Sequence, residues 1–179
     1  MKSRIALSLL FVLMMMAVTA FAADATATQS DSQKAFDQLK TLLGTWEGHI
    51  STFPTTPEID GKAMRVSLRT TSMGNALVHE MTGEGRPDDP ITMLYLDGGR
   101  LLLTHYCDAG NRPRMVGKAS PDGKTVEFEF LDVAGSAEYG HMHHAVFTFI
   151  DENHHTEDWT YMQPGDKPVR AHVDLQRTK

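Results

Sequence analysis

A histidine and a cysteine stand two residues apart in the apolar stretch Leu101–Cys107. Side chains two apart on a β-strand project from the same face. Arg100 and Asp108 lie on the opposite face of this strand, and because both are charged we expect that face to be exposed. His105 and Cys107 should therefore point inwards. An imidazole beside a thiol can bind a soft metal ion or form a thiolate–imidazole pair. One of each supplies only half of a zinc site, so a buried thiol beside a hydrogen-bonded histidine is the alternative.

The richest group of histidines follows later in the chain, in the stretch His-Met-His-His at residues 141–144. On a strand His141 and His143 share a face, and this phase directs both imidazoles towards the mouth of a barrel lumen. Neutral imidazoles at this spacing can bind zinc or copper, or an axial position of haem. Solvated turn histidines are the alternative. We predict no cofactor, with haem or zinc held by His105, Cys107, His141 and His143 as the competing hypothesis.

An acidic and an aromatic side chain share a face in the stretch 155–162. Glu157 and Trp159 lie two apart, and a tryptophan is a natural apolar wall for a small-molecule pocket. A buried Glu157 needs a partner because an unpaired buried carboxylate is costly. Arg114 and Arg69 are the predicted partners. In the alternative, Glu157 sits at a rim and faces water.

The elements that position these residues are one helix and a series of strands. Ser30 resembles a helix cap, and Gly44 supplies the stop after a helical stripe of apolar residues. Strict alternation follows, as in the inward set Val126, Phe128 and Phe130. The predicted strands are 45–53, 62–73, 76–84, 90–97, 100–107, 113–119, 125–133, 143–151, 155–162 and 169–177. We predict an all-β fold, an antiparallel meander of about ten strands closed into a barrel, with a two-sheet sandwich as the rival.

The junction between helix and first strand carries a resemblance. The motif Gly44-Thr-Trp46-Glu-Gly48, placed between a helix and an antiparallel meander, resembles the calycin group of lipocalins, fatty-acid-binding proteins and nitrobindin-type haem barrels. The stretches 101–107 and 110–115 resemble exported bacterial proteins of unassigned function. The resemblance implies that Trp46 packs over the closed end of the barrel. It also implies haem binding through a last-strand histidine, for which His172 is the counterpart, although its spacing to the following arginine is two residues shorter and it falls on the polar face.

The beginning of the chain predicts export. Lys2 and Arg4 precede an apolar run over residues 5–18, and the small-x-small pattern at 20–22 fits cleavage after Ala22. We therefore divide the chain into a signal peptide (1–22), a flexible leader (23–32) and a calycin-like barrel domain (33–179). The expected location is periplasmic or extracellular, with no membrane span after cleavage.

The composition and the motifs limit the kinds of partner and chemistry that we expect for this protein. The net charge of −6 argues against nucleic acid, whose backbone requires clustered lysine and arginine. Cys107 is the only cysteine, so no disulfide can form within the chain. No catalytic motif is recognised, and whether the protein is an enzyme stays open. Oligomeric state is likewise open.

These observations predict a protein that binds a small apolar or amphipathic molecule inside a barrel. The predicted ligand-binding residues are His105, Arg114, Phe128, Phe130, Phe147, Glu157 and Trp159. The phenylalanines and the tryptophan would form the walls, and the polar side chains would anchor a head group. An enzyme in which a His105–Glu157 pair transfers protons is a further alternative.

Overall fold

The computed structural model describes residues 29–86 and 89–178. The predicted signal peptide and most of the predicted leader lie outside the described residues. The described chain begins with α1 (Asp31–Leu39) and a 3₁₀ turn, η1 (Lys40–Leu42). The predicted cap is confirmed, because the Ser30 hydroxyl accepts a hydrogen bond from the backbone N–H of Gln33 at 3.2 Å. Among the described residues, no helix is both long and apolar enough to span a bilayer.

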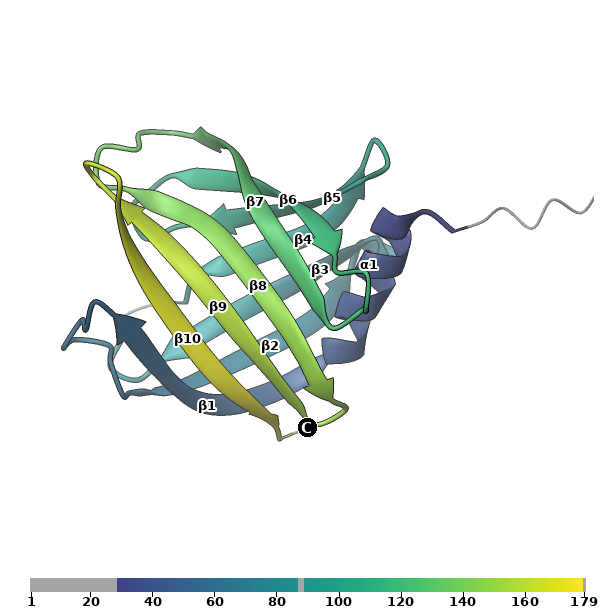
Figure 1. Cartoon of the computed structure of the whole chain (residues 1–179), viewed down its shortest axis with the longest axis horizontal. Coiled ribbons are helices and arrows are strands. Elements are labelled where there is room, and N and C mark those ends of the chain that lie inside the picture. Colours follow the sequence, from purple (N-terminus) through teal and green to yellow (C-terminus); the bar gives the residue numbers. More distant parts are fainter. Residues whose placement is uncertain (1–28, 87–88, 179) are drawn as a thin grey trace, which may run out of the picture.

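Ten antiparallel strands form a closed barrel, in which consecutive strands pair and the last returns to the first (Figure 1). A short 3₁₀ turn, η2 (Ser72–Gly74), connects the second strand to the third. The strands are β1 (Gly44–Phe53), β2 (Ala63–Thr71), β3 (Ala76–Gly83), β4 (Ile91–Asp97), β5 (Arg100–Tyr106), β6 (Arg112–Ala119), β7 (Thr125–Ala134), β8 (His141–Asp151), β9 (His154–Gln163) and β10 (Lys167–Arg177). The predicted all-β barrel is confirmed, and the sandwich is wrong because β1 pairs with β10 from Trp46–Arg177 to Phe53–Arg170.

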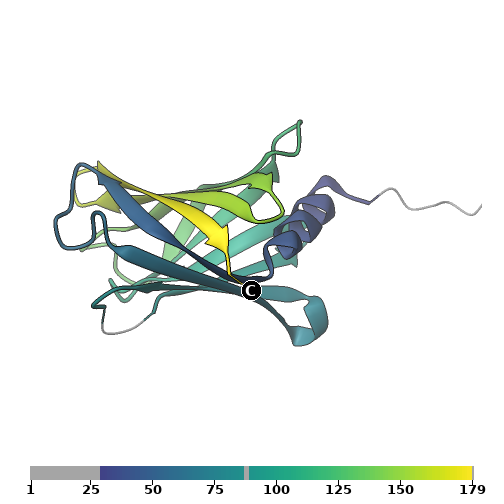
Figure 2. The ribbon, with the colours of Figure 1, turned by 90° about the horizontal axis from the view of Figure 1, so that it is seen from below.

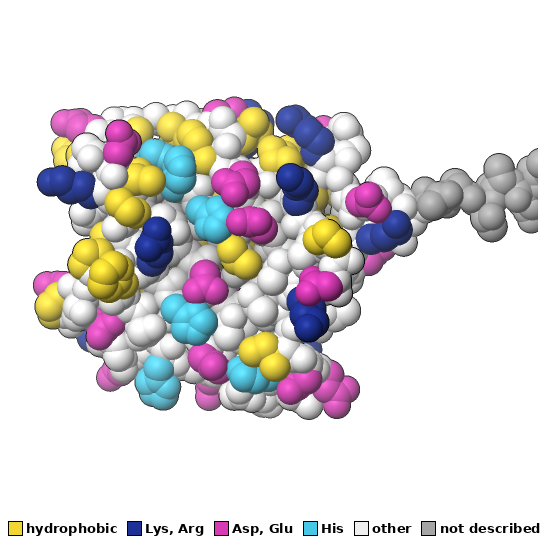
Figure 3. Space-filling model, in the orientation of Figure 1, with side chains coloured by type: hydrophobic (Ala, Val, Ile, Leu, Met, Phe, Trp, Pro, Cys, Tyr) yellow, Lys and Arg dark blue, Asp and Glu magenta, His cyan; other side chains and the backbone are white. Residues whose placement is uncertain are grey.

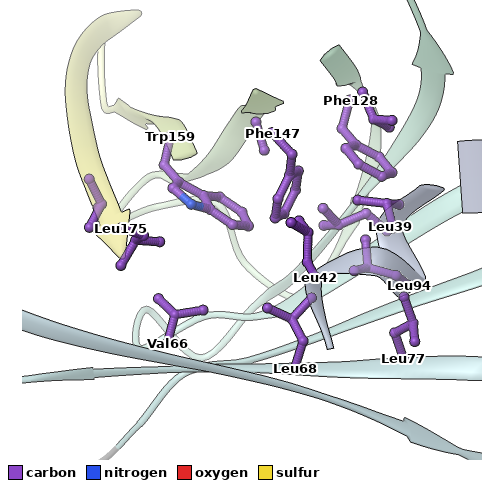
Figure 4. Packing of buried hydrophobic residues seen from close by; sticks show 14 of the residues in the cluster. Leu39, Leu42, Val66, Leu68, Leu77, Leu94, Phe128, Phe147, Trp159 and Leu175 are labelled. Atoms are coloured by element: carbon purple, nitrogen blue, oxygen red, sulfur yellow. The ribbon is translucent and has the colours of Figure 1, made fainter. Parts of the chain in front are cut away.

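One end of the barrel is filled by apolar side chains. This end is covered by α1, which packs against β4, β5 and β6 (Figure 2). Alternation along the strands directs these side chains inwards, so that Phe128 is buried between the exposed Glu127 and Glu129. Figure 4 shows Phe128 and Phe147 beside the leucines of the helical segment. The filled end includes Leu39, Leu42, Leu68, Leu77, Leu94, Phe128 and Phe147.

Trp46 joins the helical segment to the barrel wall. Its side chain is fully buried, and its indole N–H donates to the carbonyl of Leu42 at 2.8 Å. The guanidinium of Arg177 lies 4.0 Å from the centre of the Trp46 ring. Arg177 also donates hydrogen bonds to the carbonyls of Leu43 and Thr41. The last residue of β10 therefore fixes the start of β1 and the turn before it.

Gly48 explains the second glycine of the Gly-x-Trp-x-Gly motif. It lies opposite Leu175 in the β1–β10 pairing. A Cβ atom at this position would collide with the backbone carbonyl of Asp174. Because backbone cannot move aside as a flexible side chain can, only glycine permits this close approach of the two closing strands.

Candidate functional site

The end of the barrel opposite α1 contains a cavity of about 360 Å³. Its wall is mostly apolar, and charged residues occur where the strand connections form its mouth. The apolar lining includes Ile50, Ile59, Met64, Met81, Met142, Val169, Ala171 and Val173. The charged lining residues are Lys62, Glu84, Arg86 and Asp108. The charged side chains of the lining therefore lie at the mouth, and a mostly apolar wall with a few polar groups is typical of a small-molecule site.

A fully buried carboxylate lies behind the cavity wall. Glu157 is 0% exposed and accepts hydrogen bonds from three nitrogen atoms. The donors are His79 Nε2 at 2.9 Å, His155 Nε2 at 3.1 Å and the indole nitrogen of Trp159 at 3.0 Å. We call these four residues the Glu157 network. His155 and Trp159 come from the strand of Glu157 itself, whereas His79 reaches it from β3.

These partners keep the carboxylate ionised. Burial alone would raise the pKa of Glu157, but the charge of His79 and the hydrogen bonds from both histidines outweigh it and hold the pKa well below its usual value. The predicted arginine partners are wrong, because the structure supplies imidazole and indole donors instead. Arg114 pairs with Asp132 on the barrel surface, Nε to Oδ1 at 2.8 Å, and Arg69 pairs with Glu80.

The second ring nitrogens of the two network histidines are unused. Among the described residues, His79 Nδ1 and His155 Nδ1 are buried without a hydrogen-bond partner. His79 lines the cavity, whereas His155 packs edge-on against Trp46 with ring centres 4.2 Å apart. The network therefore reaches from the filled end of the barrel to the cavity.

His105 occupies the cavity wall beside this network. It is 6% exposed, and its Nδ1 lies 2.8 Å from the hydroxyl of Thr92. Burial, followed by repulsion from His79, lowers the pKa of His105 to about 4, so this imidazole is neutral at neutral pH. Its Nε2 atom has no partner among the described residues, and unlike His79 Nδ1 it is not fully enclosed.

Strand pairing places the histidines in one row. His79 pairs with Thr92, and Thr92 pairs with His105, so β3, β4 and β5 contribute one polar side chain each at the same level. Trp159 faces this row from β9, with its ring centre 5.7 Å from that of His79 and 5.8 Å from that of His105. The inner cavity thus combines an aromatic surface held by Glu157 with an imidazole held by Thr92.

Two predicted anchor residues are not joined as expected. No hydrogen bond links His105 to Glu157 among the described side chains, because each is bonded to another partner. The predicted proton-transfer pair is therefore replaced by two separate units, Glu157 with His79 and His105 with Thr92. A carboxylate that orients an imidazole is a recurrent arrangement in binding and catalytic sites.

The predicted aromatic wall is divided between the two ends of the barrel. Trp159 lines the cavity, whereas Phe128 and Phe147 lie in the filled end. Phe130 is half-buried and stacks on His143, with ring centres 4.8 Å apart. Prediction from alternation identified which residues turn inwards but not how deep along the barrel each one lies.

The predicted metal ligands are likewise separated. His105 and Cys107 both line the cavity, but His141 and His143 do not. Their imidazoles lie 3.1 Å apart beside Phe130. A register shift between Met142 and His144 adds a residue to β8, and Met142 faces the cavity instead of a histidine.

Other histidines pair with carboxylates on the outer face of β7–β10. The pairs are His144–Glu127, His154–Asp174 and His172–Asp158, at 2.9, 2.9 and 2.7 Å. Figure 3 shows this face with histidine and acidic side chains next to one another. Glu127, Glu129 and His144 form the only group of three metal-ligating side chains within reach of one ion in the described part of the chain. Exposed groups of this kind are common without a metal.

The structure does not fit the haem position that the family resemblance implies. His172 is 45% exposed on its side chain and bonds to Asp158 outside the barrel. It lies on the outer face of β10, where alternate residues such as Val173 line the cavity. A haem in the lumen could not be bound by this histidine.

Three residues of the site were not predicted from the sequence: His79, Thr92 and His155. His79 alternates with Leu77 and Met81, so the pattern of the stretch 76–84 could have indicated an inward histidine. His155 shares the face of Glu157 and Trp159 and could have been found in the same way. Thr92 carries no comparable signal, because its role depends on cross-strand pairing.

Comparison with known proteins supports the fold. No family model matches the chain, and no curated protein matches it. Among solved structures, Rv2717c from M. tuberculosis aligns with a TM-score of 0.59 and 17% identity, over 81% of this chain and 98% of that chain. A protein of unknown function from the DUF3598 family of Nostoc punctiforme aligns with a TM-score of 0.56 and 13% identity, over 78% of this chain and 49% of that chain. At these identities the likeness is one of fold, a ten-stranded barrel of the calycin-like kind.

Proposed function

We propose that the protein is an exported binding protein that holds a small, largely apolar molecule in the cavity opposite α1. The observation that carries this proposal is the cavity of about 360 Å³, with an apolar wall and a few fixed polar groups at its inner end. Burial of the ligand would supply most of the affinity, at roughly 25 cal/mol per Å² of apolar surface. Export is supported by the pattern of residues 1–22.

A cavity-filling variant tests the proposal. Ala171 lines the cavity, and its neighbour Arg170 is exposed on the outer face of the same strand. Ala171→Trp should weaken binding of the neutral fluorescent probe N-phenylnaphthylamine by about tenfold or more, whereas Arg170→Trp should bind it like wild type. Equal affinities for the two variants would show that the probe binds elsewhere. Mass spectrometry of gently purified protein would then identify any molecule lost with Ala171→Trp.

Metal binding is the second candidate. It is supported by His105 and Cys107, an imidazole and a thiol on the same cavity wall. Zinc retained through dialysis and lost in His105→Phe would favour this function. Zinc retained equally by both proteins would place the metal outside the cavity.

A further inference from the structure

We propose that the inner end of the cavity recognises one uncharged polar group, such as the hydroxyl of a phenol or alcohol, on an otherwise apolar ligand. His105 is the residue that binds this group. The inference rests on the proposed function, because it specifies the ligand that the cavity takes. It also gives a role to Nε2 of His105, a ring nitrogen without a partner among the described residues.

The polar atoms at the inner end can be accounted for one by one. His79 uses Nε2 on Glu157, and its Nδ1 is fully enclosed. The Thr92 hydroxyl is bonded to Nδ1 of His105. Nε2 of His105 has no partner among the described residues and is not enclosed. A polar group on a ligand therefore finds its hydrogen-bond partner at His105.

The distribution of charge selects a neutral group. The charged lining residues Lys62, Glu84, Arg86 and Asp108 all lie in strand connections at the mouth. At the inner end the carboxylate of Glu157 is already satisfied by three donors. An anionic group would face this carboxylate across Trp159, and a cationic group would find no free carboxylate oxygen. Either charge would lose its hydration without compensation.

The orientation of His105 acts in the same direction. Its Nδ1 is held by the Thr92 hydroxyl at 2.8 Å, so Nε2 is left for one hydrogen bond with a ligand hydroxyl. Trp159 offers an aromatic surface beside it, which suits a flat ligand body.

Four naphthalene derivatives of similar size provide the test: naphthol, methylnaphthalene, naphthoate and naphthylmethylammonium. Their affinities for the full-length mature protein are measured by titration at neutral pH, following naphthalene fluorescence. Naphthol should bind about fivefold more tightly than each of the other three, since one net hydrogen bond contributes about 1 kcal/mol. Preferential binding of naphthoate or naphthylmethylammonium would overturn the inference while leaving the proposed function intact. Failure of all four probes to bind would instead overturn the proposed function.

Variants then test the role of His105. His105→Phe should reduce the affinity for naphthol to that for methylnaphthalene, and His105→Gln should restore part of it. His172→Phe is the control, because His172 lies on the outer face. If His105→Phe does not fold, Thr92→Val removes the partner that orients the ring and should weaken naphthol binding selectively. Unchanged preference for naphthol in folded His105→Phe, or in Thr92→Val where His105→Phe does not fold, would exclude His105 as the anchor.

Discussion

Replacing Glu157 with leucine should destabilise the barrel by about 4 kcal/mol, because the carboxylate has three buried donors. Leucine is similar in size but leaves the N–H groups of His79, His155 and Trp159 without an acceptor. A change of tautomer would not help the imidazoles, since their Nδ1 atoms are buried without partners.

The magnitude follows from the number of orphaned groups. Each unsatisfied buried donor costs about 1–3 kcal/mol. The surroundings relax in part, so the total is smaller than the sum over the three donors. Removal of one partner of a buried ion pair costs about 3–5 kcal/mol, and 4 kcal/mol lies within this range. For a domain of about 150 residues, 4 kcal/mol corresponds to a fall in Tm of roughly 10 °C. This is a large part of the roughly 5–15 kcal/mol that stabilises a typical domain.

Urea unfolding followed by circular dichroism measures the effect. Asp158→Leu is the matched control: it removes the next carboxylate on β9, which pairs with His172 on the surface, and should cost less than about 1 kcal/mol. The double variant Glu157→Leu/His79→Phe should lose less unfolding free energy than the two single variants together, by at least about 1 kcal/mol. Equal losses in Glu157→Leu and Asp158→Leu would refute the reasoning.

Three further predictions concern other parts of the barrel. His105 binds a proton with a pKa of about 4 when folded, against 6.5 for the free side chain, so stability should fall by roughly 3 kcal/mol as pH drops through this interval. Urea midpoints across this pH range should vary less in His105→Gln, and an identical pH slope would contradict the assignment. Arg177→Ala should cost about 2 kcal/mol in urea unfolding, because it removes the stack on Trp46 and two carbonyl contacts at the chain junction. Arg177→Lys should recover only part of this loss, and full recovery would show that charge alone matters. Gly48→Ala should lower Tm by more than about 5 °C through its collision with the backbone of β10, whereas Gly123→Ala, in a turn with open space around the Cβ position, should lower it less; a larger loss at Gly123 would contradict the packing argument.

The fold could be predicted from sequence because its signals are local. Turn residues separate the strands, alternation gives their inner faces, and Ser30 and Gly44 delimit the helical segment. The closure of the barrel has no local signal in the sequence, because it joins the first strand to the last. A sandwich and a barrel use the same strands, and only the pairing of β1 with β10 distinguishes them.

The candidate site could be predicted only in part, for the same reason. Alternation brought out Glu157, Trp159 and His105 as inward residues, but the partners of Glu157 depend on which strands meet across the lumen. Proximity of His79 on β3 to Glu157 on β9 is set by the curvature of the closed sheet. The extra residue in β8 changed which side chain faces the cavity, and such bulges leave little trace in composition.

The placement of three network members on a single strand has a consequence for folding. His155, Glu157 and Trp159 occupy alternate positions of β9, so a slip of one residue would turn all three to the outside together. The same slip would bring Asp158 inside without the imidazole of His155 or the indole of Trp159 in position to donate to it. Misalignment of a strand with one apolar face exposes apolar surface, and misalignment of β9 would in addition leave the buried His79 without its carboxylate partner. The network therefore selects the correct alignment of β9 with its neighbours at the moment the barrel closes.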